Sequence, residues 1–372
     1  MTYAESLAAA RATFRDWLDA VPEAGRVVVF CHFDADGLAA GALFGRGVPR
    51  LGRSFGEVAV VPSGRDESAF SDGARERLAA LAPDALLVTD LGVNARGTLE
   101  ASGVPVLYVD HHRPSGEPDG AFVVSGYDWD PIPCSAWLAY DLLRDVAEVD
   151  DLDWIAAVGV LSDLGDKAPW PELAAVKKER TATWLKETVA LINAARRAPT
   201  FDAQTALDAL MTFDDPKELA QAETPLVDRL RQAREAVKSE LAEARKAAPV
   251  FSERDPAVPD GAAPSDLRFA LVTVDSPAQV HPLIAQQWRG RLGKYPVICA
   301  NVGYLDGIVA FSTRTARRDV RLPVLYQSID TPGWNGRWGH GHDQASGGHL
   351  PPDVFNDVLD ALGFGPEAHV RG

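Results

Sequence analysis

Short runs of Val, Leu and Ile recur through the first third of the chain, and stretches with helical patterning separate them. The apolar runs cover residues 26–30, 58–61, 85–89, 104–109 and 122–124. Helical stretches lie between them at 37–44 and 74–81, and others follow at 135–146 and 153–161. Continuous apolar runs are typical of strands that are buried on both faces. Because strands and helices alternate, the pattern predicts an α/β fold with a doubly wound, mainly parallel sheet.

Between about residue 174 and residue 247 the pattern becomes almost entirely helical. Its last part, LVDRLRQAREAVKSELAEARKAA, carries charges of both signs and contains neither Gly nor Pro. Such a segment is typical of a helix that exposes one face to solvent. We therefore expect a long helix that connects two domains.

A loop rich in Pro and Asp, at residues 253–266, is the best candidate for a domain boundary. Beyond it we expect a second, smaller α/β domain, with a helix at 282–290 and strands at 267–274, 296–302 and 308–311. The sequence thus predicts three regions, which are a first domain at 1–200, a helical connector at 201–252 and a second domain at 266–372.

Composition and charge narrow the functional class. Three cysteines in 372 residues are too few and too scattered for a disulfide framework, which fits a reducing cytoplasm. The N-terminal residues lack the apolar core of a signal peptide, and no later segment is apolar enough to span a membrane, so we expect no membrane partner. The net charge is −16 and no large cluster of Lys and Arg stands out, which favours short or single-stranded substrates over a nucleic-acid duplex.

Asp and His residues occur in four short blocks, each at the end of an apolar run. The blocks are HFDADG at 32–37, VTDLG at 88–92, VDHHRP at 109–114 and GVLSDLGD at 159–166. The carboxyl ends of parallel strands share one edge of a sheet, where ligands bind. The pattern therefore predicts that residues distant in sequence meet at one point, namely Asp34, Asp36, Asp90, Asp110, His111, His112 and Asp163.

Such a concentration of acidic groups favours a bound metal. Carboxylates a few ångströms apart cannot all ionise, because each raises the pKa of its neighbours, and a dication removes this penalty. Oxygen and imidazole ligands suit Mn²⁺ and also tolerate Mg²⁺, zinc or iron. The number of carboxylates exceeds the need of one ion. We therefore expect two ions, which together can activate a water molecule for phosphoester hydrolysis.

The four blocks resemble motifs one to four of the DHH phosphoesterases, and WGHGHDQASGG at 338–348 is similar to the glycine-rich signature of the DHH-associated substrate-binding domain. The resemblance covers most of the chain. It implies that Asp90 bridges two ions within a ligand set of His32, Asp34, Asp36, Asp90, His111 and Asp163. Many members have their first histidine at the position of Phe30, so His32 departs from that spacing. His32 either ligates a metal or orients Asp34.

The remaining candidate residues contact the substrate. By the resemblance, His112 faces the substrate phosphate or donates a proton to the leaving oxygen, and Asp110 supports an imidazole by hydrogen bonding. Glycine lets backbone amides approach a phosphate closely, and arginine can bind it through two hydrogen bonds. In the second domain the resemblance implies that His342 contacts the substrate, and we expect Gly341, Gly347 and the hydroxyl of Ser346 to contribute to phosphate binding. Arg314 either binds the phosphate or is an ordinary exposed arginine. Trp334 and Trp338 either stack on a base or pack within this domain.

Together these features predict a manganese-dependent phosphoesterase whose active site lies between the two domains of a monomer or homodimer. The expected substrate is single-stranded DNA or RNA, or a short oligonucleotide or nucleotide, hydrolysed from an end. One alternative is a small-molecule phosphatase, a polyphosphatase or a cyclic-dinucleotide phosphodiesterase of the same superfamily, which the acidic composition favours. Another is a non-catalytic nucleic-acid-binding module, which the intact Asp and His blocks disfavour.

Overall fold

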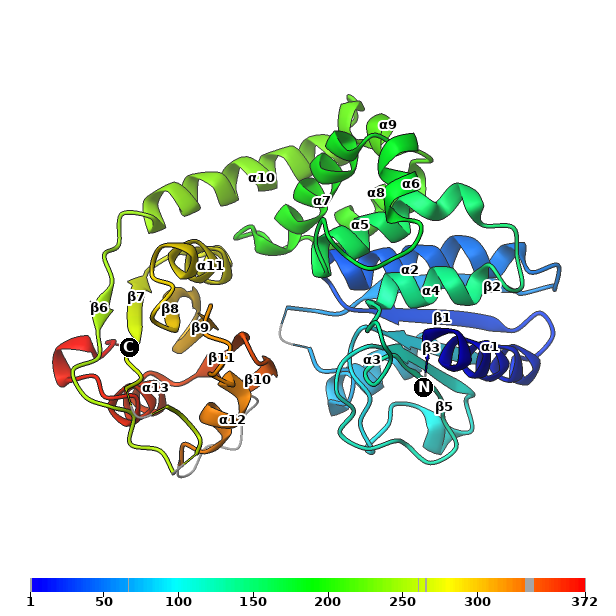
Figure 1. The fold of residues 1–372 in the computed structure, drawn as a ribbon. Coiled ribbons are helices and arrows are strands. Elements are labelled where there is room, and N and C mark those ends of the chain that lie inside the picture. The colour runs from blue at the N-terminus through cyan, green and yellow to red at the C-terminus, as the bar shows by residue number, and fades with distance from the viewer. Residues whose placement is uncertain (1, 66, 260, 265, 332–337, 372) are drawn as a thin grey trace. The chain divides into compact units, whose positions relative to one another are not determined.

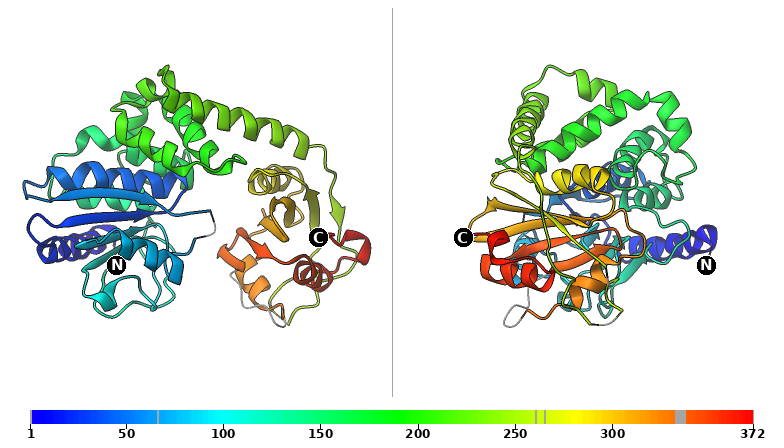
Figure 2. Two further views of the ribbon diagram at one scale, coloured as in Figure 1. Left: turned by 180° about the vertical axis from the view of Figure 1, so that it is seen from behind. Right: turned by 60° about the vertical axis from the view of Figure 1, so that its left-hand side comes forward.

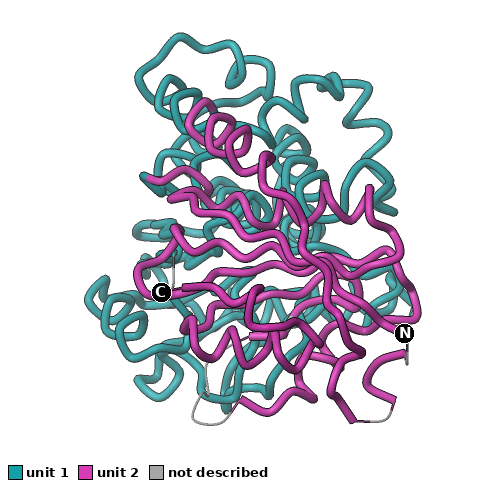
Figure 3. The backbone as a smooth tube through the Cα atoms, turned by 90° about the vertical axis from the view of Figure 1, so that its left-hand side faces the viewer, with its two compact units in different colours: residues 1–196, 200–234 teal, residues 197–199, 235–372 magenta. Residues whose placement is uncertain are grey.

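The chain forms two compact units, which Figure 3 distinguishes by colour. The computed structural model describes residues 2–65, 67–259, 261–264, 266–331 and 338–371. The first unit comprises Met1–Arg196 and Thr200–Arg234, and the second comprises Arg197–Pro199 and Glu235–Gly372. The division falls inside the long helix α10 (Pro225–Ala244). Most of the segment expected as a connector thus packs with the first unit.

The first unit is built on a five-stranded parallel sheet with the strand order β2-β1-β3-β4-β5 (Figure 1). Its strands are β1 (Arg26–Cys31), β2 (Glu57–Pro62), β3 (Ala85–Thr89), β4 (Val106–Asp110) and β5 (Phe122–Ser125). The predicted doubly wound fold is therefore confirmed. The direction of winding reverses between β1 and β3, because β2 lies on one side of β1 and all later strands lie on the other. Open α/β sheets bind ligands at such a reversal, outside the carboxyl ends of the strands.

Helices cover both faces of this sheet, as the alternating side chains of its strands require. Val27 and Val29 of β1 belong to the core with α1 (Tyr3–Ala20), α2 (Ala35–Gly47) and α4 (Ser135–Leu143). Val28 and Phe30 belong to the core on the other face, which contains Leu78 of α3 (Asp72–Ala80). Figures 1 and 2 show α2 running along the sheet close to β1.

The rest of the first unit is helical, as the sequence predicts. It comprises α5 (Asp153–Asp163), α6 (Leu173–Glu179), α7 (Ala182–Arg197), α8 (Ala203–Thr212) and α9 (Pro216–Gln221). Ile192 of α7 and Leu207 of α8 join the same core as α2, so these helices form a further layer on that side. Within the described residues, no helix is both long and apolar enough to cross a membrane.

The second unit contains a six-stranded mixed sheet with the order β10-β11-β9-β8-β7-β6. The expected strands and helix correspond to β7 (Ala270–Val274), β8 (Val297–Leu305), β9 (Ile308–Arg314) and α11 (His281–Arg291). The sequence analysis missed β6 (Val250–Phe251), β10 (Trp338–His342), β11 (Ala345–Leu350), α12 (Leu322–Gln327) and α13 (Pro352–Ala361). The strands β10 and β11 were missed because they are rich in glycine, which is depleted in strands.

The packing of α2, α4 and α5 generates a testable prediction about Gly159 of α5. A β-carbon at this position would lie 2.3 Å from Cβ of Ala136 and 2.8 Å from Oδ1 of Asp36. Gly159→Ala should therefore lower the free energy of unfolding by about 1–3 kcal/mol, as overpacking does in a tight core. Gly73→Ala in α3 is the matched control, since nothing lies within 4 Å of its added carbon. Equal urea midpoints for the two variants would refute the packing argument.

Candidate metal centre

The predicted ligands meet at the carboxyl ends of β1, β3 and β4, where the winding of the sheet reverses. His32 and Asp34 lie in the loop from β1 into α2, Asp90 directly follows β3, and His111 directly follows β4. Asp163 is the last residue of α5 and reaches the same point. This convergence agrees with the position predicted from the four sequence blocks.

Asp90 occupies the middle of the cluster. Its Oδ2 lies 3.5 Å from Nδ1 of His32, and its Oδ1 lies 3.5 Å from Nε2 of His111 and 3.9 Å from Nδ1 of His112. One carboxylate thus faces imidazoles on both of its oxygens. Asp90 is thus the carboxylate that lies between the two imidazoles of His32 and His111.

Three groups of side chains place their ligand atoms within 4.8 Å of one another. The groups are His32 with Asp34 and Asp90, Asp36 with His111 and Asp163, and Asp90 with His111 and His112. The first two contain all six predicted ligands. The donor set of carboxylate oxygens and imidazole nitrogens fits Mn²⁺ or Mg²⁺.

His32 joins the cluster despite its unusual spacing. Its Nδ1 lies 3.3 Å from Oδ1 of Asp34, and this buried nitrogen forms no hydrogen bond with any described residue. A buried nitrogen directed at two carboxylates is suited to hold a cation. Phe30, which occupies the position of the first histidine in many DHH proteins, is buried in the core on the α3 side of the sheet.

Burial and mutual repulsion make the cluster a favourable place for a cation. Burial, together with the charges of Asp90 and Asp163, raises the pKa of Asp36 to about 8. Burial disfavours the charged imidazoles of His32 and His111, but the neighbouring carboxylates outweigh it and raise the pKa of each to about 10. The excess negative charge is therefore balanced either by protons or by a divalent ion that displaces them.

The ends of two helices organise the carboxylates. Asp34 caps α2, since its Oδ1 accepts the amides of Asp36 and Gly37 at 3.1 Å. Both carboxylate oxygens of Asp36 accept amides at the start of α4, from Ser135 at 2.8 Å and Ala136 at 3.0 Å. Helix N-termini stabilise negative charge, so these contacts offset part of the repulsion within the cluster.

Ser135 is a site residue that the sequence analysis missed. It is fully buried, and its hydroxyl donates a 2.9 Å hydrogen bond to Oδ1 of Asp90. Its amide binds Asp36, so one residue positions two predicted ligands. A serine at the start of the apolar helix SAWLAYDLL was the available signal, but only the packing of α4 reveals its partners.

Asp110 does not belong to any of the three ligand groups. Its buried carboxylate accepts the amides of Gly92 at 2.7 Å and of His112 at 2.6 Å, and it lies 3.2 Å from Nδ1 of His112. These contacts hold the turn after β3 and orient the imidazole, in line with the supporting role expected of Asp110. The side chain of His112 is 47 % exposed, so it remains open to a substrate.

The backbone at Asp90 is also unusual. Its φ of 62° lies in the left-handed region, which aspartate and asparagine tolerate better than most residues. A substitution that tests this carboxylate should therefore be asparagine, which removes the charge with little change in backbone preference.

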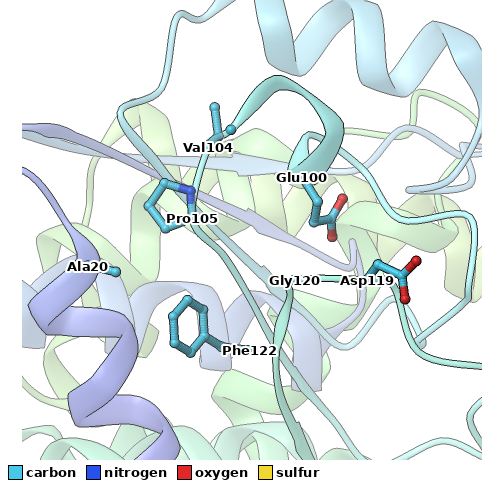
Figure 4. A pocket seen from close by; sticks show the side chains of 8 residues that line it. Ala20, Glu100, Val104, Pro105, Asp119, Gly120 and Phe122 are labelled. Carbon is cyan, nitrogen blue, oxygen red and sulfur yellow. The ribbon is translucent and has the colours of Figure 1, made fainter.

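The cavity in Figure 4 is separate from this centre. Its volume is about 310 Å³, and Ala20, Pro105 and Phe122 are among its lining residues. Pro105 immediately precedes β4 and Phe122 begins β5, so the cavity lies at the amino ends of the strands. The metal centre lies at their carboxyl ends.

In the second unit, two of the predicted phosphate-binding residues share one face of the sheet. His342 pairs with Ala345 and Ala345 pairs with Arg314, and directly paired residues project to the same side. Burial and the nearby Arg289 of α11 lower the pKa of the Arg314 guanidinium. Arg289 therefore adds a second positive charge beside Arg314, which the sequence analysis did not identify.

The other predicted residues of this unit are placed differently. Ser346 is buried and pairs with Thr313, one position away from the His342 row, so it projects to the opposite face. Gly341 has a φ of 126°, and a β-carbon on Gly347 would lie 2.3 Å from the carbonyl oxygen of Phe311. Both glycines thus allow the β10–β11 hairpin to pack. Trp338 contacts Tyr326 with ring centroids 5.6 Å apart, so it packs within the unit, whereas Trp334 lies outside the described residues.

Comparison with known proteins identifies the fold. No protein-family model and no curated protein sequence matches the chain. A solved structure of the exonuclease RecJ bound to manganese matches with a TM-score of 0.61 and 22% identity, over 95% of this chain and 93% of that one. RecJ of Thermus thermophilus in complex with Mn²⁺ matches with a TM-score of 0.64 and 22% identity, over 95% of this chain but only 54% of the other. This chain thus spans about half of the Thermus protein.

A DHH domain described as a member of the s1p family of ribosomal proteins matches with a TM-score of 0.69 and 16% identity, over 96% of this chain and 90% of that one. The matches extend across both units. The resemblance inferred from the motifs is therefore confirmed at the level of fold, and the protein has the architecture of RecJ and of DHH-domain proteins.

The ligand groups predict unequal roles for two histidines. His111 is 4 % exposed and lies in two of the groups, whereas His32 is 27 % exposed and lies in one. His111→Ala should weaken Mn²⁺ binding by about a hundredfold and His32→Ala by about tenfold, within the range for groups around a bound metal. Isothermal titration with Mn²⁺ measures both. His369→Ala, which removes a partner of Asp360, is the control. A larger loss for His32→Ala would overturn the ranking.

The raised pKa values predict that metal binding releases protons. His32 and His111 have pKa values of about 10 and Asp36 of about 8, so at pH 7 these groups hold protons that a metal must displace. Mn²⁺ affinity should therefore rise between pH 6 and pH 8, by up to about tenfold per pH unit for each displaced proton. Titrations in buffers of different ionisation enthalpy count the released protons. Affinity independent of pH, with no proton release, would contradict the prediction.

Proposed function

We propose that this protein is a metal-dependent phosphoesterase that hydrolyses phosphodiester bonds in single-stranded DNA or RNA or in short oligonucleotides, from an end. The observation that carries the proposal is a pair of neighbouring ligand groups. One consists of His32, Asp34 and Asp90, and the other consists of Asp36, His111 and Asp163. Asp90 connects them, because it lies 3.5 Å from His111. Two adjacent sites of this composition are typical of enzymes that transfer or hydrolyse phosphate esters.

The residues of the chain have distinct parts in this mechanism. The two ligand groups would hold the ions, which when bound would supply an activated water and stabilise charge on the leaving oxygen. Asp90 belongs to the first group and lies 3.5 Å from His111 of the second, and Ser135 and the start of α4 hold Asp90 and Asp36 in place. Partial loss of solvent contact opposes protonation of the half-exposed His112 imidazole, but its hydrogen bond with Asp110 outweighs this effect and raises its pKa. His112 is thereby favoured as the donor of a proton to the leaving oxygen.

Manganese is the proposed metal, with Mg²⁺ as a second possibility. Two proteins with this fold are described as bound to manganese, and one of them is described as an exonuclease. In the second unit we propose that substrate phosphates bind to His342, Arg314 and Arg289. His342 and Arg314 share one face of the sheet, and the two arginines bring positive charge there. We place the protein in the cytoplasm because its three cysteines are free and buried. A monomer or a homodimer is the proposed state.

A substrate panel distinguishes this proposal from its nearest alternative. The acidic composition favours small substrates, so a polyphosphatase or cyclic-dinucleotide phosphodiesterase is the second candidate. We expect Mn²⁺-dependent shortening of end-labelled 5-mer and 30-mer DNA or RNA, with little release of phosphate from pyrophosphate. Hydrolysis of pyrophosphate or a cyclic dinucleotide alone would favour the alternative. Binding without hydrolysis of any substrate would indicate a non-catalytic module.

Asp90→Asn tests the central role of this carboxylate. The variant should lose hydrolysis by at least about a hundredfold, because a neutral amide cannot serve two cations as a carboxylate does. Its metal content should also fall, as measured by atomic emission. The control is Asp166→Asn. Asp166 belongs to the same sequence block as Asp163, but it pairs with Lys177 and Lys186 and not with the predicted ligands. Full metal content and turnover at the intact rate in Asp90→Asn would exclude the proposed centre.

A further inference from the structure

A line of planar side chains leads away from the metal centre. The rings of His32 and Phe33 have centroids 4.2 Å apart, and those of Phe33 and Phe201 are 5.3 Å apart in an edge-to-face arrangement. The guanidinium carbon of Arg65 lies 5.2 Å from the centroid of Phe201. Each of these side chains is half-buried and keeps part of its surface in solvent. The line therefore begins at a predicted metal ligand and ends on a positive charge.

Hydrophobic core packing does not account for the two phenylalanines. Neither Phe33 nor Phe201 belongs to any of the hydrophobic clusters formed by the described residues. Phe33 lies between His32 and Asp34 in the loop after β1, where a polar residue would leave the ligand spacing unchanged. The aromatic ring of Phe33 is therefore available for contact with a ligand bound at the metal centre.

The backbone at Phe201 supports the same conclusion. Its φ of 40° lies in the left-handed region, which is unfavourable for a large L-residue. The next residue, Asp202, caps α8 by accepting the amide of Thr205 at 3.0 Å. Strained backbone of this kind persists where the surrounding structure imposes it, and it concentrates at functional sites.

Positive charge accompanies the aromatic line. Arg65 lies over the ring of Phe201. Stacking surfaces combined with cations are the typical means by which proteins hold single-stranded nucleic acid, since the rings take the bases and the cations the backbone. A polyphosphate chain would use the charges but not the rings.

We propose that Phe33 and Phe201 form a stacking platform for a nucleobase of the substrate, with Arg65 supporting its outer end. The platform makes the site prefer a phosphate ester that carries a base over one that does not. This inference rests on the proposed function, because it assumes that the phosphate beside that base binds at the metal centre.

Binding of two simple probes tests the platform without requiring hydrolysis. Adenosine 5′-monophosphate and ribose 5-phosphate share the sugar and the phosphate and differ in the base. In the presence of Mn²⁺, the wild-type protein should bind the nucleotide at least tenfold more tightly. Phe201→Leu should weaken nucleotide binding by about fivefold to a hundredfold, the range for the loss of one stacked base, and should leave ribose 5-phosphate binding unchanged.

Two further variants control for indirect effects. Phe201→Tyr keeps an aromatic ring and should retain nucleotide affinity within about twofold. Phe55→Leu removes another phenylalanine of the first unit that lies under an arginine, Arg53, and should leave the affinity for both probes unchanged. Equal wild-type affinity for the two probes, binding of neither, or equal losses for both in Phe201→Leu would overturn the inference.

The same variants separate this inference from the proposed function. If base-dependent binding is found but no phosphodiester is hydrolysed, the platform stands and the proposed activity fails. If oligonucleotides are hydrolysed and the Michaelis constant of Phe201→Leu matches that of the wild type, the activity stands and the platform fails.

Discussion

Repulsion among carboxylates is the constraint on which the metal centre depends. Asp34, Asp36, Asp90 and Asp163 converge within a few ångströms, and two of them, Asp36 and Asp90, are buried. Such an arrangement is unfavourable unless positive charge or hydrogen bonds compensate it. The first unit supplies both kinds of compensation, through two imidazoles and through the N-termini of two helices.

The sheet determines where these groups meet. Parallel strands direct β1, β3 and β4 to one edge, and the reversal between β1 and β3 opens space there for a ligand. The helices then set the distances. α2 starts so close to β1 that a β-carbon on Gly37 would lie 2.5 Å from Cβ of His32, and Gly159 allows α5 to approach Asp36. The position of each ligand therefore depends on close contacts between backbones.

The second unit brings positive side chains together, whereas the first unit brings carboxylates together. Its sheet carries Arg314 near Arg289, two cations whose mutual repulsion an anion would relieve. The hairpin of β10 and β11 brings His342 to the same face through the register of three strands. The two units thus have opposite local charge, since the first gathers carboxylates and the second places two arginines close together.

The sequence by itself determined the class of fold and which Asp and His residues converge at one edge of the sheet. Buried strands read as continuous apolar runs, and three of these runs, at 26–30, 85–89 and 104–109, lead directly into Asp and His residues that lie in the cluster. These features are local, because apolar patterning and the chemistry of the strand ends do not depend on distant packing. The resemblance of the motifs extended the fold prediction to both units, and the folds of the matching structures agree with that prediction.

Only the tertiary structure decided how those ligands are held. Ser135 contacts Asp36 and Asp90, which are distant from it in sequence, and this pairing exists because α4 packs against α2. The opposite orientations of Ser346 and His342 follow from strand register, and glycine-rich strands carry no pattern that specifies it. The line from His32 to Arg65 joins three loops, and no periodicity relates their residues. Contacts of this kind arise from long-range packing, so the sequence could name the residues but not their neighbours.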